Sequence, residues 1–367
     1  MITGKNKLTI SSYDDIKNPF YGGGGAIAIH ELAKRLISKY QVNIISWNHS
    51  GIANEVIDGV NYTRIGSKVV HPKIGMLFFQ LCLPFVMMTS KFDLWIESFS
   101  PPFTTAFLPL FTKRPVIGVV HMLAAEDMRR KYKISLEKLE KLGLGFYKYI
   151  VVTSTNLKSK IQLLNKTINI RVIENGVDIG INHKTKRKKQ VLFLGRLELD
   201  QKGLDLLVKA FSVFTKNNPN FMLAIAGNGS EQEVSKLKKM IDSCNLSDRV
   251  YLAGRVSGLK KQQLLNESYC LVIPSRFETF SIVALEAMAA GLPLVTFDID
   301  GLGWIPKQAV VKAKSFDINS LSRQMSKVVN DQKLMSRMKS EGLAYAQDFT
   351  WDIVAKKYEE LIDEIHN

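Results

Sequence analysis

Short apolar runs alternate with longer stretches of helical periodicity along the first half of the chain. The runs have the length of β-strands, and their alternation with helical stretches is the βαβ pattern. We expect strands at Lys7–Ser11, Val42–Trp47, Asp93–Ser98, Val116–His121, Tyr149–Ser154 and Ile168–Ile173. Glu55–Ile65 has Asp58-Gly59 between two shorter runs and predicts a β-hairpin inserted into this pattern.

The second half repeats the pattern after a highly charged run, His183–Lys189, that is too polar to be core. We expect strands at Gln190–Leu197, Phe221–Gly227, Arg249–Gly254, Cys270–Pro274, Leu294–Phe297 and Ala309–Lys312. Two doubly wound parallel sheets follow, which is an α/β fold. We place the domains at residues 1–176 and 177–350, with the linker beginning near Asn175-Gly176-Val177-Asp178.

Length and composition agree with two domains. The 367 residues exceed the usual size of one hydrophobic core, and 46% of them are hydrophobic. The net charge is +16; residues 1–176 carry 23 Lys/Arg against 12 Asp/Glu, a net of +11, and residues 177–367 carry 27 against 22, a net of +5. A basic first half predicts an anionic partner, and nucleic acid, a membrane surface and a phosphorylated acceptor all remain open.

Cysteine usage and the N-terminus bear on the compartment. Cys82, Cys244 and Cys270 are widely spaced, so we expect neither a disulfide nor a zinc site. The first residues lack the charged, apolar and small-residue pattern of a signal peptide. We therefore expect a cytoplasmic protein.

Two glutamates eight positions apart bracket the start of a helix. Glu278 follows the apolar run ending at Pro274, and Glu286 lies about one turn into an Ala- and Met-rich segment that ends at Gly291. The free N–H groups at such a helix start attract a diphosphate, and a carboxylate can accept hydrogen bonds from ribose hydroxyls. From these residues alone, a surface acid followed by an ordinary helical Glu is an equally good explanation.

The setting Pro-Ser-x-x-Glu-x-Phe-Ser-x-x-x-x-Glu-Ala-Met-Ala-x-Gly resembles the family-4 retaining glycosyltransferases of GT-B fold. The resemblance implies two Rossmann-like domains facing across a cleft, with the C-terminal helix within residues 351–367 completing the first. It implies that Glu278 contacts hydroxyls of the donor sugar and that Glu286 holds the ribose. The donor nucleotide would also contact Thr279, Phe280, Ser281, Ile282 and Val283, and Ser281 stands where the family often has Gly. Because a loop acid contributes little to packing, we expect Glu278→Ala to cut turnover and to leave thermal stability nearly unchanged.

A second motif follows the first strand of the second half. Arg196 and Lys202 flank a turn that ends at Gly203, and two cations at the carboxyl end of a parallel strand suit a diphosphate. Alone, the motif is more simply explained by two solvated residues in a loop. Gly-Arg-Leu-x-x-x-Lys-Gly resembles the family's diphosphate site, which implies that both cations stabilise the leaving group without a metal ion.

Three further positions gain a meaning from the resemblance. A glycine-rich loop between the first strand and helix, formed by Gly22, Gly23, Gly24 and Gly25, would face the donor phosphates or the acceptor. His121 closes a strand, and we expect it to position groups near the transferred sugar carbon and not to act as a general base. Arg255-Val256 matches the family's segment near the nucleobase.

A metal site is not expected. Asp298-Ile-Asp300 has the look of an Asp-x-Asp cation site, but the Arg/Lys pair already supplies positive charge. This stretch is also where the chain departs from the family pattern, which usually continues Asp-x-Gly-Gly-x-x-Glu. We expect no cofactor beyond a nucleotide-sugar donor, most simply a UDP- or GDP-sugar.

Two segments raise the question of membrane contact. Ile74–Ser90 is a 17-residue run without a charge, too short to span a bilayer comfortably, and a buried helix is the favoured explanation over interfacial insertion. The basic and aromatic segment from Met128 to Lys148 would suit a peripheral enzyme acting on an anionic lipid-linked acceptor.

The sequence thus predicts a retaining hexosyltransferase that moves a sugar from a nucleotide diphosphate to a hydroxyl of a glycan or lipid-linked acceptor in glycan or glycolipid biosynthesis. Two alternatives stay open: a GT-B nucleotide-sugar epimerase, and a basic nucleic-acid-binding protein. The second would need a basic stripe interleaved with exposed aromatics, which the chain lacks, so we expect no nucleic-acid partner.

Overall fold

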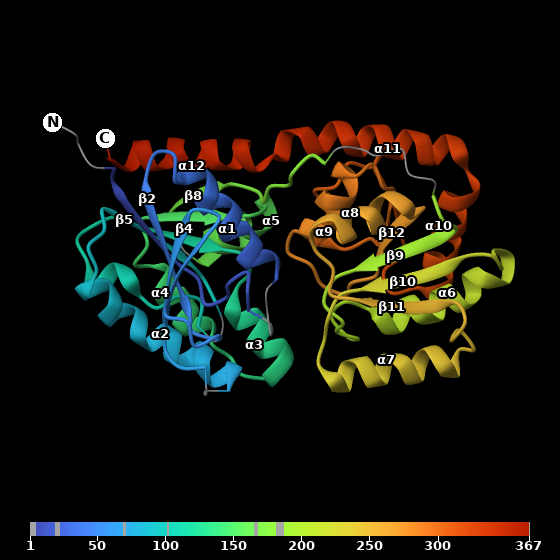
Figure 1. Ribbon diagram of the computed structural model, residues 1–367, viewed down its shortest axis with the longest axis horizontal. Coiled ribbons are helices and arrows are strands. Elements are labelled where there is room, and N and C mark those ends of the chain that lie inside the picture. The colour runs from blue at the N-terminus through green and yellow to red at the C-terminus, as the bar shows by residue number, and fades with distance from the viewer. Residues whose placement is uncertain are drawn as a thin grey trace. The chain divides into compact units, whose positions relative to one another are not determined.

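The computed structural model describes residues 5–18, 23–68, 71–100, 103–164, 168–180 and 187–366. The chain divides into two compact units (Figure 1). The first unit comprises Met1–Asn175 and Trp351–Asn367, and the second comprises Gly176–Thr350.

The first unit is built on an eight-stranded sheet of order β3-β4-β2-β1-β5-β6-β7-β8. Only the β3–β4 pair is antiparallel among these described strands, and it is the hairpin that Asp58-Gly59 predicts. The strands are β1 Lys7–Ser11, β2 Gln41–Trp47, β3 Asn54–Ile57, β4 Val60–Ile65, β5 Leu94–Ser98, β6 Val116–Val120, β7 Tyr149–Val152 and β8 Asn169–Val172.

Helices cover this sheet on both faces. The C-terminal helix α12 (Trp351–His366) packs on α1 (Gly24–Leu36), and the Arg35 and Lys39 side chains of the α1 region pair with Asp352 and Glu359 of α12 at 2.7 and 2.6 Å. The other helical elements of the unit are α2 Pro72–Thr89, η1 Leu108–Phe111, α3 Ala124–Tyr132, α4 Glu137–Leu144 and α5 Thr155–Leu164.

Helix α2 departs from the sequence expectation of a buried helix. Phe79, Leu83 and Met87 are buried in the core of the first unit, as expected. The opposite side of the helix is exposed and carries large apolar side chains, including Phe85 with 68% of its surface accessible. The expectation is therefore wrong for half of the helix. Among the described helices, none combines the length and hydropathy needed to cross a bilayer.

The second unit has a six-stranded parallel sheet of order β11-β10-β9-β12-β13-β14. Its strands are β9 Gln190–Leu194, β10 Met222–Ala226, β11 Val250–Gly254, β12 Cys270–Ile273, β13 Leu294–Phe297 and β14 Val310–Ala313. Its helices are α6 Leu204–Asn217, α7 Glu231–Ser243, α8 Gly258–Glu267, α9 Ile282–Ala289, α10 Ile318–Asn330 and α11 Gln332–Ala346, with short turns η2 Asp300–Leu302 and η3 Gln347–Phe349.

Strand alternation explains why this sheet is covered on both faces. Successive side chains of a strand point to opposite faces, so a strand buried on both sides is apolar throughout. Val191 and Phe193 of β9 enter the core shared with α6 and α10, whereas Leu192 enters the core shared with α9. Two parallel-dominated sheets with alternating helices confirm the predicted fold class. In such sheets ligands bind beyond the carboxyl ends of the strands, where the predicted site residues fall.

Candidate active site

Glu278 lies in the loop between β12 and α9, with its carboxylate turned into a polar cluster. Its Oε1 accepts hydrogen bonds from Lys202 Nζ and from the Ser275 hydroxyl, both at 2.7 Å. Only 9% of the Glu278 side chain is exposed. Glu278 is thus more tightly packed than a loop acid was expected to be. We now expect Glu278→Ala to lower stability, because it would leave the Lys202 ammonium without its carboxylate partner.

The loops that carry Lys202 and Glu278 are fastened to each other. Arg276 donates from both terminal nitrogens to the two carboxylate oxygens of Asp205, at 2.8 and 2.7 Å. The Arg276 backbone N–H donates to the Gln201 carbonyl at 2.9 Å. Such a bidentate pair fixes orientation as well as distance. The structure thus brings together two motifs that are 76 residues apart in sequence.

A glycine makes this approach of the two loops feasible. Gly203 has φ +65°, a conformation that favours glycine, and a Cβ placed there would lie 1.9 Å from the Pro274 carbonyl oxygen. Gly203 is the residue that immediately precedes α6. Its role in the motif is therefore to let the loop that follows β9 pack directly against the end of β12.

Arg196, the other predicted cation, follows β9 in the same loop as Lys202. About half of its side chain is exposed, and its guanidinium lies 3.5 Å from the Glu198 carboxylate. Unlike Lys202, it is not held by Glu278. A half-exposed guanidinium at the carboxyl end of a strand is free to reorient towards an anionic ligand.

Glu286 is also paired with a lysine. It is a residue of α9, and its Oε1 accepts a hydrogen bond from Lys261 Nζ of α8 at 2.7 Å. Only 14% of the Glu286 side chain is exposed. The ammonium orients this carboxylate, whose oxygens can accept hydrogen bonds from sugar hydroxyls.

The segment between the two glutamates enters α9 by a sharp turn. Thr279 and Phe280 lie in the loop, Ser281 is the N-cap, and Ile282 and Val283 are the first residues of the helix. Ser281 has φ +67°, which explains why glycine suits this position. Backbone N–H groups at the start of α9 have no helical partners, so this turn provides the donors expected for a diphosphate.

The segment where the chain departs from the family pattern supports this turn. Trp304 stacks on Phe280 with ring centroids 4.4 Å apart, and its Nε1–H donates to the Phe280 carbonyl at 2.5 Å. Gly301 lies so close to Glu278 that a Cβ there would be 1.8 Å from the Glu278 carbonyl oxygen. The segment after β13 thus packs against the backbone of the loop between β12 and α9, which carries Glu278 and which we call the glutamate loop.

Neither aspartate of this segment joins a metal cluster in the described part of the chain. Asp298 pairs with Lys312 at 2.9 Å, and Asp300 begins the short turn η2. The described residues contain no group of three or more His, Cys, Asp or Glu side chains arranged to hold a metal ion. The absence of a metal requirement stays a prediction.

In the first unit, part of the glycine-rich segment that was expected to be a loop belongs to helix α1. Gly23 is the N-cap of α1, and Gly24 and Gly25 already belong to its first turn, while Gly22 lies outside the described residues. The Gly23 N–H donates to the Asp14 carboxylate at 3.2 Å. A Cβ on Gly25 would lie 3.9 Å from Cδ2 of His121, so these two predicted positions are neighbours.

His121 directly follows β6 at the carboxyl edge of the sheet, as predicted. Its Nε2 is buried, and the described residues offer it no hydrogen-bond partner. Burial lowers the pKa of His121 to about 4, so the imidazole is neutral near pH 7. A neutral ring with an open nitrogen fits a positioning role better than that of a proton donor.

Arg255 and Val256 follow β11, and the Gly254 that precedes them has φ +68°. Arg255 is exposed and Val256 packs against the core beneath α9. Their proximity to a nucleobase stays a prediction.

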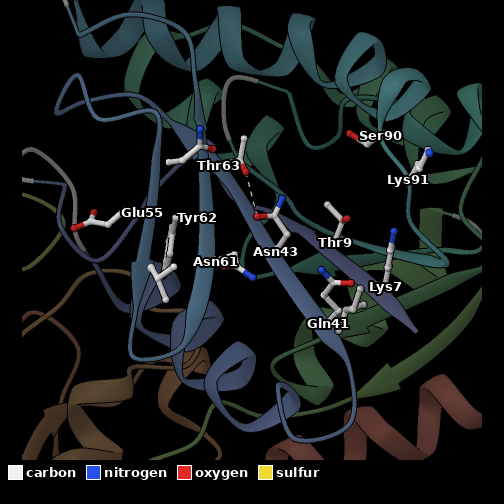
Figure 2. Close-up of a pocket in the computed structure, with 13 residues that line it drawn as sticks. Lys7, Thr9, Gln41, Asn43, Glu55, Asn61, Tyr62, Thr63, Ser90 and Lys91 are labelled. Carbon is white, nitrogen blue, oxygen red and sulfur yellow. Dashed lines mark hydrogen bonds between the residues drawn. The ribbon is translucent and has the colours of Figure 1, made fainter. Parts of the chain in front are cut away.

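A cavity of about 680 Å³ lies elsewhere in the first unit, on the sheet face formed by β1, β2, β3 and β4 (Figure 2). The strand register places Thr9, Asn43 and Asn61 side by side on this face. Figure 2 also shows the Thr63 hydroxyl bonded to the Asn43 side chain, at 3.2 Å. Lys7 and Gln41, which line the cavity, are the first residues of β1 and β2. The cavity therefore lies towards the amino ends of these strands, away from the carboxyl ends where the predicted site residues of this unit lie.

Four residues of the candidate site escaped sequence reasoning: Ser275, Arg276, Lys261 and Trp304. Ser275 and Arg276 stand inside the motif that carries Glu278, so their position was a usable signal. Lys261 is an ordinary helical lysine in sequence, and nothing local distinguishes it. Trp304 lies in the segment without a family pattern.

Comparisons with known proteins bear on the family and the fold. The model of glycosyl transferases group 1 matches residues 177–344, and that of glycosyltransferase family 4 matches residues 22–180. The two parallel-dominated sheets with alternating helices define the GT-B fold. The chain belongs to the group 1 glycosyltransferases, with a family 4 N-terminal half.

Individual relatives span most of the chain. An uncharacterized glycosyltransferase of Methanocaldococcus jannaschii is 26% identical over 91% of this chain and 93% of its own length. The GDP-mannose:cellobiosyl-diphosphopolyprenol alpha-mannosyltransferase of Xanthomonas oryzae is 28% identical over 71% of this chain and 69% of its own.

Solved structures share the fold at lower identity. The sucrose-phosphate synthase of Thermosynechococcus elongatus has a TM-score of 0.84 and 18% identity, with 99% of both chains covered. An Anabaena protein in complex with UDP-glucose has a TM-score of 0.76 and 16% identity, covering 98% of this chain and 100% of that chain.

Proposed function

We propose that this glycosyltransferase transfers a hexose, with retention of anomeric configuration, from a nucleotide diphosphate sugar to a hydroxyl of a glycan or lipid-linked acceptor. The 2.7 Å contact between Lys202 and Glu278 carries the proposal, because it joins the cation that we expect to bind the diphosphate to the carboxylate that we expect to bind the sugar. In the donor complex, the Lys202 ammonium would contact the phosphates as well as Glu278. Glu278 would accept hydrogen bonds from the sugar hydroxyls.

The other predicted residues take consistent roles. Glu286 would hold the ribose hydroxyls, and the N–H groups at the start of α9 would bind the diphosphate. As the leaving phosphate gains charge, Arg196 and Lys202 would stabilise it without a metal ion. The departing phosphate itself would take the acceptor proton, which leaves His121 a positioning role suited to its neutral state.

The proposed acceptor and the choice of donor nucleotide are supported by the names of similar proteins. One of them is named for a GDP-mannose donor and a diphosphopolyprenol acceptor, which supports a lipid-linked acceptor and a GDP-sugar donor here. A structural neighbour was solved with UDP-glucose, which supports a UDP-sugar. Both donors therefore belong in the first experiment.

Thermal unfolding across a panel of UDP-, GDP-, ADP- and dTDP-sugars tests the donor. A ligand at a hundred times its dissociation constant stabilises the native state by about 2.7 kcal/mol. One nucleotide-sugar should raise the melting temperature selectively, without added metal and to the same extent with Mg²⁺. A shift that requires Mg²⁺ would contradict the metal-independent mechanism.

The stereochemical part of the proposal has its own test. With the preferred donor and an accepted hydroxyl compound, the anomeric proton coupling in the NMR spectrum of the product should match that of the donor. An inverted coupling would refute retention. Conversion of the donor sugar without any acceptor would favour the epimerase alternative.

A further inference from the structure

The exposed side of α2 forms a continuous apolar stripe. Its members recur every three or four residues and therefore lie on one side of the helix. We call these residues the α2 stripe: Ile74, Leu77, Phe78, Leu81, Phe85 and Met88. All are at least 37% exposed, and Leu81 and Phe85 reach 55% and 68%. A helix that is apolar on both sides is normally covered on both, so an uncovered stripe of this length indicates a partner.

The apolar surface continues onto neighbouring elements. The short helix η1 packs on α2 and exposes Leu110 and Phe111. Phe107, which precedes η1, lies with its ring centroid 6.2 Å from that of Phe146, and Phe146 is itself exposed just after α4. Exposed apolar side chains therefore also lie on η1, which packs on α2, and just after α4.

The charge around this surface is one-sided. From the start of α2 to just after η1, residues 72–113 contain three lysines, Lys73, Lys91 and Lys113, and two acids, Asp93 and Glu97. Glu97 is buried, and Asp93 pairs with Arg114 at 2.5 Å. Lys91, just after α2, and Lys113, just after η1, are exposed at the ends of these two elements. An apolar stripe with lysines at its margin matches an anionic lipid surface, where the lysines meet the headgroups and the stripe enters the acyl boundary.

We propose that the α2 stripe docks the first unit on the surface of an anionic lipid bilayer, with α2 lying in the plane of the interface. The charge-free run has 17 residues and is too short to cross a bilayer comfortably, so the proposed docking places α2 in the interface and not across the bilayer. A second copy would present the same lysines and so offers no opposite charge to this surface, whereas an anionic bilayer does. The docking itself does not depend on the catalytic mechanism. The idea that docking brings the enzyme to a lipid-linked acceptor rests on the proposed function.

Vesicle co-sedimentation of the full chain tests this proposal. The protein should bind vesicles that contain phosphatidylglycerol and bind phosphatidylcholine vesicles much more weakly. Leu81→Gln with Phe85→Gln should weaken binding at least about tenfold, because two large apolar side chains no longer enter the interface. Leu163→Gln on α5 is the matched control, since Leu163 is 83% exposed and lies outside the stripe, and it should bind like the wild type.

Charge variants separate the two contributions. Lys91→Gln and Lys113→Gln should each weaken binding about fivefold, and the remaining binding should become less sensitive to salt. Unchanged melting temperatures would show that all variants fold, as expected for exposed positions. Stabilisation by a nucleotide-sugar should be equal in every variant, so failure of docking and failure of the donor proposal are distinguishable.

Three results would overturn the proposal. The wild type could fail to bind anionic vesicles, or the stripe variant could bind them as well as the wild type does. The third is a lipid-free dimer, seen by sedimentation equilibrium, that the stripe variant converts to monomer, because a second copy would then cover the stripe.

Discussion

Ser281 holds the sharpest backbone turn of the candidate site. Its φ of +67° places an L-residue in the left-handed region, which costs roughly 1–2 kcal/mol relative to glycine. Ser281→Gly should therefore stabilise the second unit relative to Ser281→Ala by about 1 kcal/mol, since alanine keeps the strained Cβ. Urea unfolding of the two variants measures the difference. An alanine variant at least as stable as the glycine variant would contradict the strain.

The buried carboxylate of Asp15 should make the stability of the first unit depend on pH in the acid range. Burial alone would raise the pKa of Asp15, but hydrogen bonds from neighbours that include the Arg64 guanidinium, at 2.6 Å, lower it to about 2. Because the folded pKa lies below the unfolded value of about 3.9, the stabilisation is present above pH 4 and is lost as pH falls towards 2.

Asp15→Asn tests this acid response. The variant should be less stable than the wild type at pH 7 by about 2 kcal/mol or more, because Arg64 loses a buried carboxylate partner. Its disadvantage should shrink as the pH falls from 4 towards 2. Melting temperatures of both proteins across this range give the comparison, and parallel curves would refute the assignment.

At the scale of elements, the glutamate loop depends on the turn η2 that packs beneath it. Gly301→Ala would place a Cβ 1.8 Å from the Glu278 carbonyl oxygen, whereas a Cβ at Gly303 would approach the Asp300 carbonyl only to 3.1 Å. Gly301→Ala should cost about 1–3 kcal/mol and raise the KM for the donor, because the loop must move. Gly303→Ala is the matched control and should cost clearly less. Equal effects on stability and on KM would show that the contact with Glu278 is unimportant.

The strands could be predicted element by element, and the helix faces could not. Runs such as Lys7–Ser11 and Leu294–Phe297 are short, rich in apolar and β-branched residues and bounded by turns, so both the strands and the parallel α/β class follow from them. In α2 the same apolar character runs around the whole helix, so no contrast between faces indicated which side is exposed. Burial of α2 was therefore overestimated.

The candidate site likewise contains residues that the sequence predicted and residues that it did not. Glu278 and Lys202 were predicted from motifs at the carboxyl ends of β12 and β9, and adjacent strands bring those ends together. The partners that orient them, such as Lys261 and Trp304, come from elements whose packing no local pattern encodes. Trp304 also lies where the chain departs from its family, so the resemblance gave no guidance there.

At the scale of the molecule, the C-terminal helix should belong energetically to the first unit. Trp351, Val354, Tyr358 and Leu361 of α12 are buried, and burial of each such side chain contributes about 1.5–3 kcal/mol. Their sum is comparable to the whole stability of a typical domain. Removal of residues 351–367 should therefore unfold the first unit and leave the second unit folded.

Hydrogen exchange followed by peptide mass spectrometry measures this. In the truncated protein β1 and β2 should lose protection, while β9 and β12 keep it. Arg35→Gln removes the surface ion pair to Asp352 and the pair to Glu31 within α1. It is the control and should cost less than about 1 kcal/mol. Equal loss of protection in both units would contradict the assignment of α12 to the first.

The central claim is that Lys202 and Glu278 act together on a nucleotide-sugar, and the rate of nucleoside diphosphate release from the preferred donor tests it most directly. Lys202→Gln and Glu278→Gln should each lower kcat/KM by about a hundredfold or more, and the double variant should lose little beyond either single change. Glu231→Gln, at the exposed start of α7, should match the wild type. Folded Lys202→Gln and Glu278→Gln variants that release nucleotide at the wild-type rate would contradict the account.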